Sequence, residues 1–433
     1  MRKAPVDLRL VAGLVILVGC GEDSATGVHP GQLTVTGPAT LDLGGRAQYT
    51  AHLTDENGAV VSGVAITWTT DNLVVASVDE NGIVTGFAGG SATVRASAAG
   101  LTGTASFHVV PALTFCKADG QLDSWCRLTD SPAGQISPSV SGSRVVFVDQ
   151  RAPGNQAIVL LDLTTGDTTT LTPDNTANII PTIDGDRVIY VRLPPTGDWQ
   201  LLTYDLNSGQ ETQFASEDRN YGFGRLALSG HRAAWHMNRN NNWDIYTYDF
   251  NTKKETRLTT DTTDQADPAI FGDRVTWSDK RNRGTWWDLY TYDFTAGKET
   301  RLTENPTLAR GSAIFGDRIV WGDSRGGLFS LYEYDFNRSD HERPVNADSL
   351  ENALTMWGGR IAWMSANDDI YAYDLDAGIQ KRVTNLASAQ QLPWISQDYL
   401  VWQDDRNGNL DIYIARLADI FRPFAAAGQY LVP

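Results

Sequence analysis

The sequence predicts an all-β protein in which a small β-sandwich precedes a seven-bladed β-propeller with four-stranded blades. The last two-thirds of the chain repeats one pattern about every 43 residues, and the region before it alternates apolar and polar residues in short runs. The 433 residues include 13 Trp, 15 Tyr and 14 Phe, and no segment shows a long amphipathic helical period. This composition favours strands joined by turns.

The repeat is marked by a glycine that is followed two residues later by an arginine. Six such pairs occur, Gly142/Arg144, Gly185/Arg187, Gly230/Arg232, Gly272/Arg274, Gly316/Arg318 and Gly358/Arg360, and Gln397/Tyr399 form a seventh, degenerate copy. Successive glycines lie 43, 45, 42, 44 and 42 residues apart. We expect the Gly-Asp-Arg segment and its variants to form the hairpin between the first two strands of each blade.

An aromatic residue stands three positions further on in every unit, as Phe147, Tyr190, Trp235, Trp277, Trp321, Trp363 and Trp402. Four short strands in such a unit make one propeller blade, and blades arranged around a ring cover one another's faces. The aromatic side chains are predicted to fill the space between neighbouring sheets. Burying each of them contributes about 4–6 kcal/mol of gross hydrophobic free energy.

The two ends of the repeat indicate how the ring closes. The seventh unit, from Leu392, has no convincing fourth strand, and an unassigned strand, Arg127-Leu128-Thr129-Asp130, precedes the first unit. We expect this strand to pair with the last blade and to cover its exposed edge. Cys116 and Cys126 stand beside it in a linker, residues 111–126. In an exported protein they can pair, for a stabilisation of about 2–3 kcal/mol.

Residues 1–19 have the pattern of a secretory signal peptide. Basic residues flank about nine apolar residues, Leu10–Val18, which are too few to cross a bilayer that needs about 20. The run ends in Leu17-Val18-Gly19-Cys20, which resembles the bacterial lipoprotein motif. The resemblance implies lipidation of Cys20, and Gly21 in place of Asp permits sorting to the outer membrane. Residues 20–31 would form a polar tether.

Residues 32–110 contain six or seven short alternating strands, with the hairpin signal Asn81-Gly82 between two of them. This number and length of strands predict an Ig-like β-sandwich with Trp68 in its core. The phrases Ile66–Asn72, Val75–Asp79, Asn81–Gly86 and Gly89–Val94 resemble the bacterial Ig-like domain, group 2. The resemblance implies a surface-exposed spacer or adhesive module.

The propeller repeat resembles the TolB-like family over residues 127–417. The matching phrases are Pro268–Trp277 and Asp288–Asp293. The resemblance implies the propeller fold, but the additional α/β domain of TolB has no counterpart here, so the partners of TolB are not carried over. Residues 418–433 would form a short C-terminal tail.

Recognisable catalytic motifs are missing from the sequence. It contains no nucleophile elbow, phosphate-binding glycine loop or Cys-x-x-Cys site, and its six histidines lack metal-ligand spacing. We therefore expect no enzyme, metal or cofactor. A formal net charge of −17 makes nucleic acid a poor partner. The alternative is a glycan-active hydrolase or lyase with its site in the propeller channel, where residues from several blades can meet without a spacing signal.

The loops between the second and third strands carry repeated Asp-x-Arg pairs. Together with two aromatic residues, three of these pairs make up the candidate binding face: Asp279, Arg281, Trp286, Asp323, Arg325, Phe329, Asp404 and Arg406. One interpretation is an ion pair that braces each loop, and another is a peptide or glycan platform anchored by Arg and Trp. A third is a Ca²⁺ site in Asp404–Asp411, although Arg406 occupies the third position of an EF-hand pattern.

These features predict an exported, lipid-anchored protein of the bacterial cell envelope, at the outer membrane or cell surface. We expect a monomer that is held to the membrane through Cys20. Its propeller would bind an envelope or extracellular protein or polysaccharide without catalysis. Ionisable residues from three or more blades around one deep pocket would favour the enzyme instead, whereas a shallow face without such convergence would favour binding.

Overall fold

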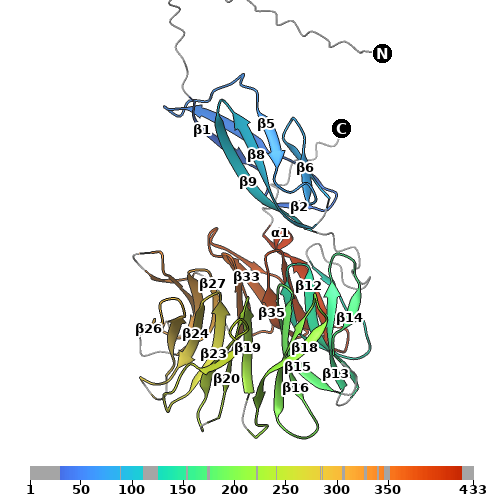
Figure 1. The fold of residues 1–433 in the computed structure, drawn as a ribbon, viewed down its shortest axis with the longest axis vertical. Helices are drawn as coiled ribbons and strands as arrows, with labels where there is room; N and C mark the ends of the chain where they lie inside the picture. Colours follow the sequence, from blue (N-terminus) through green and yellow to red (C-terminus); the bar gives the residue numbers. More distant parts are fainter. Residues whose placement is uncertain are drawn as a thin grey trace, which may run out of the picture. The chain divides into compact units, whose positions relative to one another are not determined.

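The computed structural model describes residues 30–421, apart from 88, 111–124, 153–154, 173–175, 221–222, 240, 283, 285, 305–307, 326–328, 339–340 and 346–351. The chain divides into two compact units, Met1–Phe87 with Ser91–His108, and Ala88–Gly90 with Val109–Pro433. Both are built almost entirely from strands (Figure 1), which confirms the predicted all-β class.

The first unit consists of three small sheets. They are β1 (Pro30–Thr36) with β4 (Thr50–Asp55); β2 (Thr40–Asp42), β9 (Leu101–Val110), β8 (Gly90–Ala98) and β5 (Thr67–Thr70); and β3 (Arg46–Gln48), β7 (Ile83–Gly86) and β6 (Ala76–Val78). The predicted Asn81-Gly82 turn joins β6 to β7. Gly82 has φ +78°, and a Cβ there would lie 2.8 Å from the Trp68 ring. Trp68 packs at the edge of a core around Leu33 and Leu53. The assignment of this unit to the Ig-like family stays a prediction.

The second unit is a β-propeller of seven four-stranded blades, which we number 1 to 7, and a single parallel bridge between Gln156 and Ala177 joins blades 1 and 2 into one sheet. Blade 1 is β11 (Gln135–Ser141), β12 (Arg144–Ala152), β13 (Asn155–Asp162) and β14 (Thr168–Thr170); blade 2 is β15 (Ala177–Asp184), β16 (Arg187–Leu193), β17 (Trp199–Asp205) and β18 (Gln210–Glu217); blade 3 is β19 (Phe223–Ser229), β20 (Arg232–Met237), β21 (Asp244–Asp249) and β22 (Lys254–Arg257). Blade 4 is β23 (Gln265–Phe271), β24 (Arg274–Asp279), β25 (Asp288–Asp293) and β26 (Lys298–Arg301); blade 5 is β27 (Ala309–Phe315), β28 (Arg318–Asp323), β29 (Ser330–Asp335) and β30 (Glu342–Pro344). Blade 6 is β31 (Asn352–Trp357), β32 (Arg360–Met364), β33 (Ile370–Asp374) and β34 (Ile379–Arg382); blade 7 is β35 (Gln390–Ile395), β36 (Tyr399–Asp404), β37 (Asp411–Arg416) and β10 (Trp125–Arg127), and a short helix, α1 (Leu417–Ile420), follows it.

The core of the propeller lies between the blades. Each of the seven pairs of neighbouring blades shares one cluster of buried hydrophobic side chains. The seven aromatic residues predicted for this role are all buried, and the five tryptophans among them belong to the largest fully buried side chains. Each tryptophan also stacks on a tyrosine of the third strand, with ring centroids 5.7–6.1 Å apart. The predicted hairpin glycines have φ between +54° and +60°.

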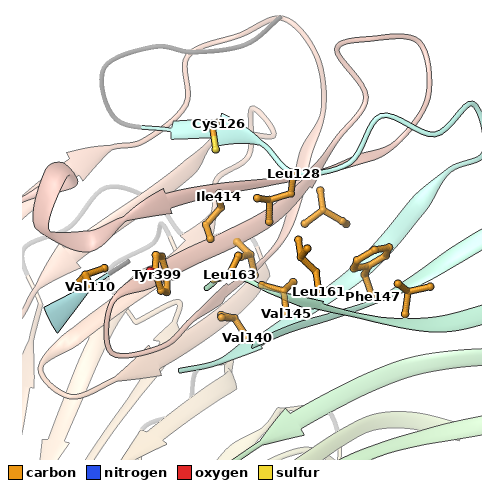
Figure 2. Close-up of a cluster of buried hydrophobic side chains, with 13 residues drawn as sticks. Val110, Cys126, Leu128, Val140, Val145, Phe147, Leu161, Leu163, Tyr399 and Ile414 are labelled. Atoms are coloured by element: carbon orange, nitrogen blue, oxygen red, sulfur yellow. The ribbon is translucent and has the colours of Figure 1, made fainter. Parts of the chain in front are cut away.

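The ring closes through an N-terminal strand, as predicted. Strand β10 pairs antiparallel with β37, with Cys126 opposite Ile414. Figure 2 shows Leu128 beside Ile414 in the cluster that joins blade 7 to blade 1. The strand was predicted over residues 127–130, whereas the observed strand covers Trp125–Arg127 and so begins two residues earlier. Beyond it, the Leu128 N–H still donates to the Ile412 carbonyl at 2.7 Å. Cys116 lies outside the described residues, so its pairing with buried Cys126 stays a prediction.

A threonine hydroxyl links the outer edge of each of five blades to the third strand. In blades 1, 3, 4 and 6 the acceptors are Thr172, Thr259, Thr303 and Thr384, and each takes a hydrogen bond of 2.8–3.0 Å from a backbone N–H of the third strand. In blade 7 the equivalent residue is Thr129, which comes from the other end of the propeller and accepts from the Ile412 N–H at 2.9 Å. The closing segment therefore supplies the same contacts as an ordinary fourth strand.

This equivalence makes Thr129 a test of ring closure. We expect Thr129→Val to lower the free energy of unfolding by about 1–3 kcal/mol, because the Ile412 N–H would lose its acceptor in a part-buried site. Thr129→Ser keeps the hydroxyl and is the control. Urea unfolding followed by tryptophan fluorescence measures both variants, and a Thr129→Val protein as stable as the wild type would contradict the closure contact.

Candidate functional site

The Asp-x-Arg loops of blades 4, 5 and 7 share one internal arrangement. The aspartate ends the second strand and is fully buried, and its carboxylate accepts from the backbone N–H of the arginine two residues later, at 2.8–3.0 Å. The arginine side chain folds back onto the same carboxylate in each loop. The tryptophan Nε1 of the same strand also donates to it, at 2.9 Å between Trp277 and Asp279. The pairs Asp279/Arg281, Asp323/Arg325 and Asp404/Arg406 therefore brace their own loops.

The arginines of these loops are also held from other sides. The guanidinium of Arg281 lies over the Tyr290 ring, 4.5 Å from its centroid, and donates to Glu299 at 2.7 Å. Arg325 and Arg406 lie over Tyr332 and Tyr413 in the same way, at 4.0 and 4.2 Å. Burial alone would lower the pKa of Arg281, but its hydrogen bonds with Asp279 and Glu299 raise that pKa above its ordinary value. These contacts support the bracing interpretation.

The other members of the predicted face differ in exposure. Trp286 is 45% exposed, as a platform residue would be, whereas Phe329 is half-buried and packs against the core between blades 5 and 6. In the segment considered for Ca²⁺, Asp404 is paired with Arg406, and Asp411 is paired with Arg127 at 2.7 Å. Within the described residues there is no group of three His, Cys, Asp or Glu side chains that could hold a metal ion.

A second candidate site lies in the propeller channel, just inside the face that carries these loops. The residue five positions before each hairpin glycine, or before Gln397 in blade 7, lines one pocket with a volume of about 480 Å³. These seven residues are Ser137, Ile180, Arg225, Asp267, Gly311, Ala353 and Leu392. Each blade thus contributes its innermost strand at the same position. We call this set the channel ring.

The backbone of the channel ring is strained. Each innermost strand carries a β-bulge next to this position, and the backbone φ is between +50° and +67° at six of the seven residues. Only one of the six is glycine, and Ile180 is β-branched, so such angles cost about 1–3 kcal/mol each. Bulges and strained residues occur preferentially at functional sites, where they redirect peptide groups and side chains.

Two ring positions carry charges, Arg225 in blade 3 and Asp267 in blade 4. Arg225 reaches across the channel and donates to the carbonyls of Ser312 in blade 5 and Leu354 in blade 6, each at 3.3 Å. Burial in the channel lowers the pKa of Arg225, and the charge of Asp267 offsets this only in part. No ion pair joins the two side chains, although both are among the described residues. The remaining wall is mainly apolar, with Met364 and Trp394 among its members.

His236 contacts the backbone of the channel ring. Its Nδ1 accepts from the backbone N–H of Asp267 at 3.1 Å, so the imidazole links blade 3 to blade 4. In the equivalent place between blades 7 and 1, Gln403 Oε1 accepts from the Ser137 N–H at 2.9 Å. The imidazole packs against Gly224, where any Cβ would overlap it. Burial lowers the pKa of His236 to about 4, and therefore the side chain is neutral at pH 7.

Sequence analysis named the propeller channel only as the place of the enzyme alternative and assigned no residues to it, whereas it named residues for the Asp-x-Arg loops. The signal was present, because counting five residues back from each hairpin glycine isolates Arg225 and Asp267 as the only charged members of the set. Cys20, the predicted lipidation site, lies outside the described residues. Among the helices of the described part of the chain, none has the length and apolar character needed to span a membrane.

Comparison with known proteins shows the fold. No family model matches the chain, and no curated protein matches it. Oligogalacturonate lyase from Vibrio parahaemolyticus superposes with a TM-score of 0.55 at 15% identity, over 70% of this chain and 95% of its own. An oligogalacturonate lyase in complex with manganese gives 0.56 at 14%, over 70% and 95%. The β-propeller domain of the Trilobed protease from Pyrococcus furiosus gives 0.54 at 13%, over 67% and 99%.

At these identities the likeness establishes the class of fold, a β-propeller, and nothing finer. The Trilobed protease domain has an open velcro topology. In this chain the ring is closed by the pairing of β10 with β37.

The bracing role of the Asp-x-Arg loops predicts different effects for two residues of the predicted face. Arg281→Met should lower the free energy of unfolding by about 3 kcal/mol, because it leaves the buried Asp279 carboxylate without its cationic partner. Trp286→Ala should change it by less than about 0.5 kcal/mol, since the ring is largely exposed. Urea unfolding compares the two, and equal stabilities would argue against the brace.

The buried imidazole predicts a pH dependence of stability. Between pH 6.5 and about 4 the unfolded state binds a proton at His236 that the folded state does not, so the free energy of unfolding falls as the pH falls through this window. The loss attributable to His236 should reach on the order of 3 kcal/mol. His236→Gln, which copies Gln403, should remove this component. Urea unfolding at several pH values measures it, and parallel profiles for the two proteins would refute the assignment.

Proposed function

We propose that this protein is an exported, lipid-anchored component of the bacterial cell envelope whose propeller is a non-catalytic binding module. The lipid on Cys20 would tether it to the membrane, and the first unit would act as a spacer. The recognition site of this proposal is the channel pocket, which accepts part of an envelope or extracellular protein or polysaccharide. A largely pre-formed concave pocket with a few polar groups is the usual form of a ligand site.

One observation carries the proposal. The seven innermost strands converge on a single pocket, yet its ionisable residues, Arg225 and Asp267, come from only two blades. A glycan-active site would need several acid, base or cation groups around one point, and convergence from three or more blades was the feature expected for it. The nearby His236 is neutral and uses Nδ1 for a backbone hydrogen bond. The pocket is therefore better suited to recognition than to catalysis.

Blocking the channel tests whether the recognition site is the channel pocket or the face that carries the Asp-x-Arg loops. Leu392→Arg places a long charged side chain on an exposed ring residue, and Leu386→Arg makes the same change at an exposed leucine that does not line the pocket. We expect immobilised protein to retain a partner from envelope extracts, and Leu392→Arg to reduce this retention at least tenfold, because the added side chain fills the pocket, while Leu386→Arg does not.

Mass spectrometry of the retained partner and of the supernatant checks for chemistry. An unchanged partner supports the binding module. Turnover of a glycan or peptide would instead establish the enzyme alternative, and retention that survives Leu392→Arg but is lost with Trp286→Ala would move the site to the Asp-x-Arg face.

A further inference from the structure

We propose that the channel pocket recognises a small zwitterion, a carboxylate and an ammonium group close together on an apolar body, as in an apolar α-amino acid. This inference rests on the non-catalytic binding role of the proposed function, and for the same pocket it names a small ligand in place of a segment of a protein or polysaccharide. Its basis is the pair of opposite, mutually unpaired charges that two neighbouring blades place in an otherwise mainly apolar channel.

The carboxylate subsite is Arg225. A guanidinium has five N–H donors, and within the described part of the chain this one donates two hydrogen bonds, each of 3.3 Å and each to a neutral carbonyl. Carboxylates make shorter and stronger bonds with arginine than neutral carbonyls do. Arg225 is half-buried in the pocket wall, and partial desolvation of a guanidinium without a counter-ion is unfavourable. The bound carboxylate of a ligand would supply that counter-ion.

The ammonium subsite is Asp267. Its backbone N–H is used by His236, which fixes the residue in the left-handed conformation with φ +54°. Among the described residues, its carboxylate makes no hydrogen bond or ion pair. In contrast, Asp279, Asp323 and Asp404 of the Asp-x-Arg loops each accept at least three hydrogen bonds. The charge of Asp267 acts on both Arg225 and His236. An ammonium group would therefore find a carboxylate that is available to accept its hydrogen bonds.

The surroundings define the rest of the ligand. Ile180, Leu354, Leu392 and Trp394 line the pocket together with three prolines, and this mainly apolar wall favours an apolar side chain over a sugar ring. A dianion such as a phosphate ester fits poorly, because the single arginine would be opposed by the negative charge of Asp267. The volume of about 480 Å³ lies in the range of small-molecule sites.

Isothermal titration calorimetry of the intact protein with L-phenylalanine and two analogues tests this chemistry. L-Phenylalaninamide lacks the carboxylate, and N-acetyl-L-phenylalanine lacks the ammonium group. We expect phenylalanine to bind and each analogue to bind about 10–100-fold more weakly, which is the loss of one charge-assisted hydrogen-bonded contact. L-Alanyl-L-phenylalanine, added in parallel, distinguishes a free amino acid from the end of a peptide.

Two variants assign the subsites. Arg225→Gln should weaken phenylalanine binding, so that phenylalanine no longer binds more tightly than phenylalaninamide. Asp267→Asn should abolish the difference in affinity between phenylalanine and N-acetyl-L-phenylalanine. Arg219→Gln is the matched control, because Arg219 is exposed, lies outside the pocket and also donates to two carbonyls, those of Pro194 and Pro195. If Arg225→Gln does not fold, Arg225→Lys keeps the charge and should retain the preference for the carboxylate at lower affinity.

The outcomes separate this inference from the proposed function. Analogues that bind as tightly as phenylalanine would overturn the zwitterion assignment but leave a ligand-binding channel. No binding of any probe, with an envelope partner still retained and still lost on Leu392→Arg, would also overturn it while the proposed function stands. Failure of both the probes and the envelope retention would overturn the two together.

Discussion

The propeller depends on one constraint, which is that a four-stranded sheet with two apolar faces must be covered on both. Seven blades meet this constraint only if blade 7 packs against blade 1, since an open ring would expose the faces of both. The seventh interface forms because β10 pairs with β37 as the fourth strand of the last blade. Leu128, just after β10, packs in the same hydrophobic cluster as Phe147 of blade 1. Closure therefore joins residues almost 300 positions apart and holds the innermost strands in a ring.

Because every blade solves the same packing problem, the positions that differ between blades are the informative ones. The stacked Trp and Tyr residues recur in five blades, and the hairpin glycines in six. The channel ring does not recur in this way. It shares a backbone conformation at six positions but carries a hydroxyl, small and large apolar groups, and one charge of each sign. The blades therefore repeat one backbone conformation but differ in the side chain at this position, which places chemically different groups around one pocket.

The fold could be predicted from the sequence because blade packing leaves a regular trace. The spacing of glycines and aromatics predicts the blades, and the missing fourth strand predicts the closure. The exact closing strand could not be placed, since Trp125 and Cys126 precede the segment that matches the repeat. Nor could spacing decide whether Arg281 points into solvent or folds back onto Asp279. The channel contacts of Arg225 were beyond sequence reasoning, because its acceptors lie 87 and 129 residues away.

Arg281 and Arg225 show why the same residue type has different consequences in two parts of the propeller. In the Asp-x-Arg loop of blade 4, Arg281 forms ion pairs with the carboxylates of Asp279 and Glu299 and lies over the Tyr290 ring. Its charge is therefore balanced within the protein. In the channel, Arg225 donates to two neutral carbonyls and forms no ion pair with Asp267, although the charge of Asp267 acts on it. An arginine whose charge and N–H donors are already used by carboxylates of the protein stabilises the fold, but few of its donors remain for a ligand. Arg225 is half-buried in the pocket and has no counter-ion among the described residues, and a ligand carboxylate would supply one, which makes Arg225 the residue where recognition gains most.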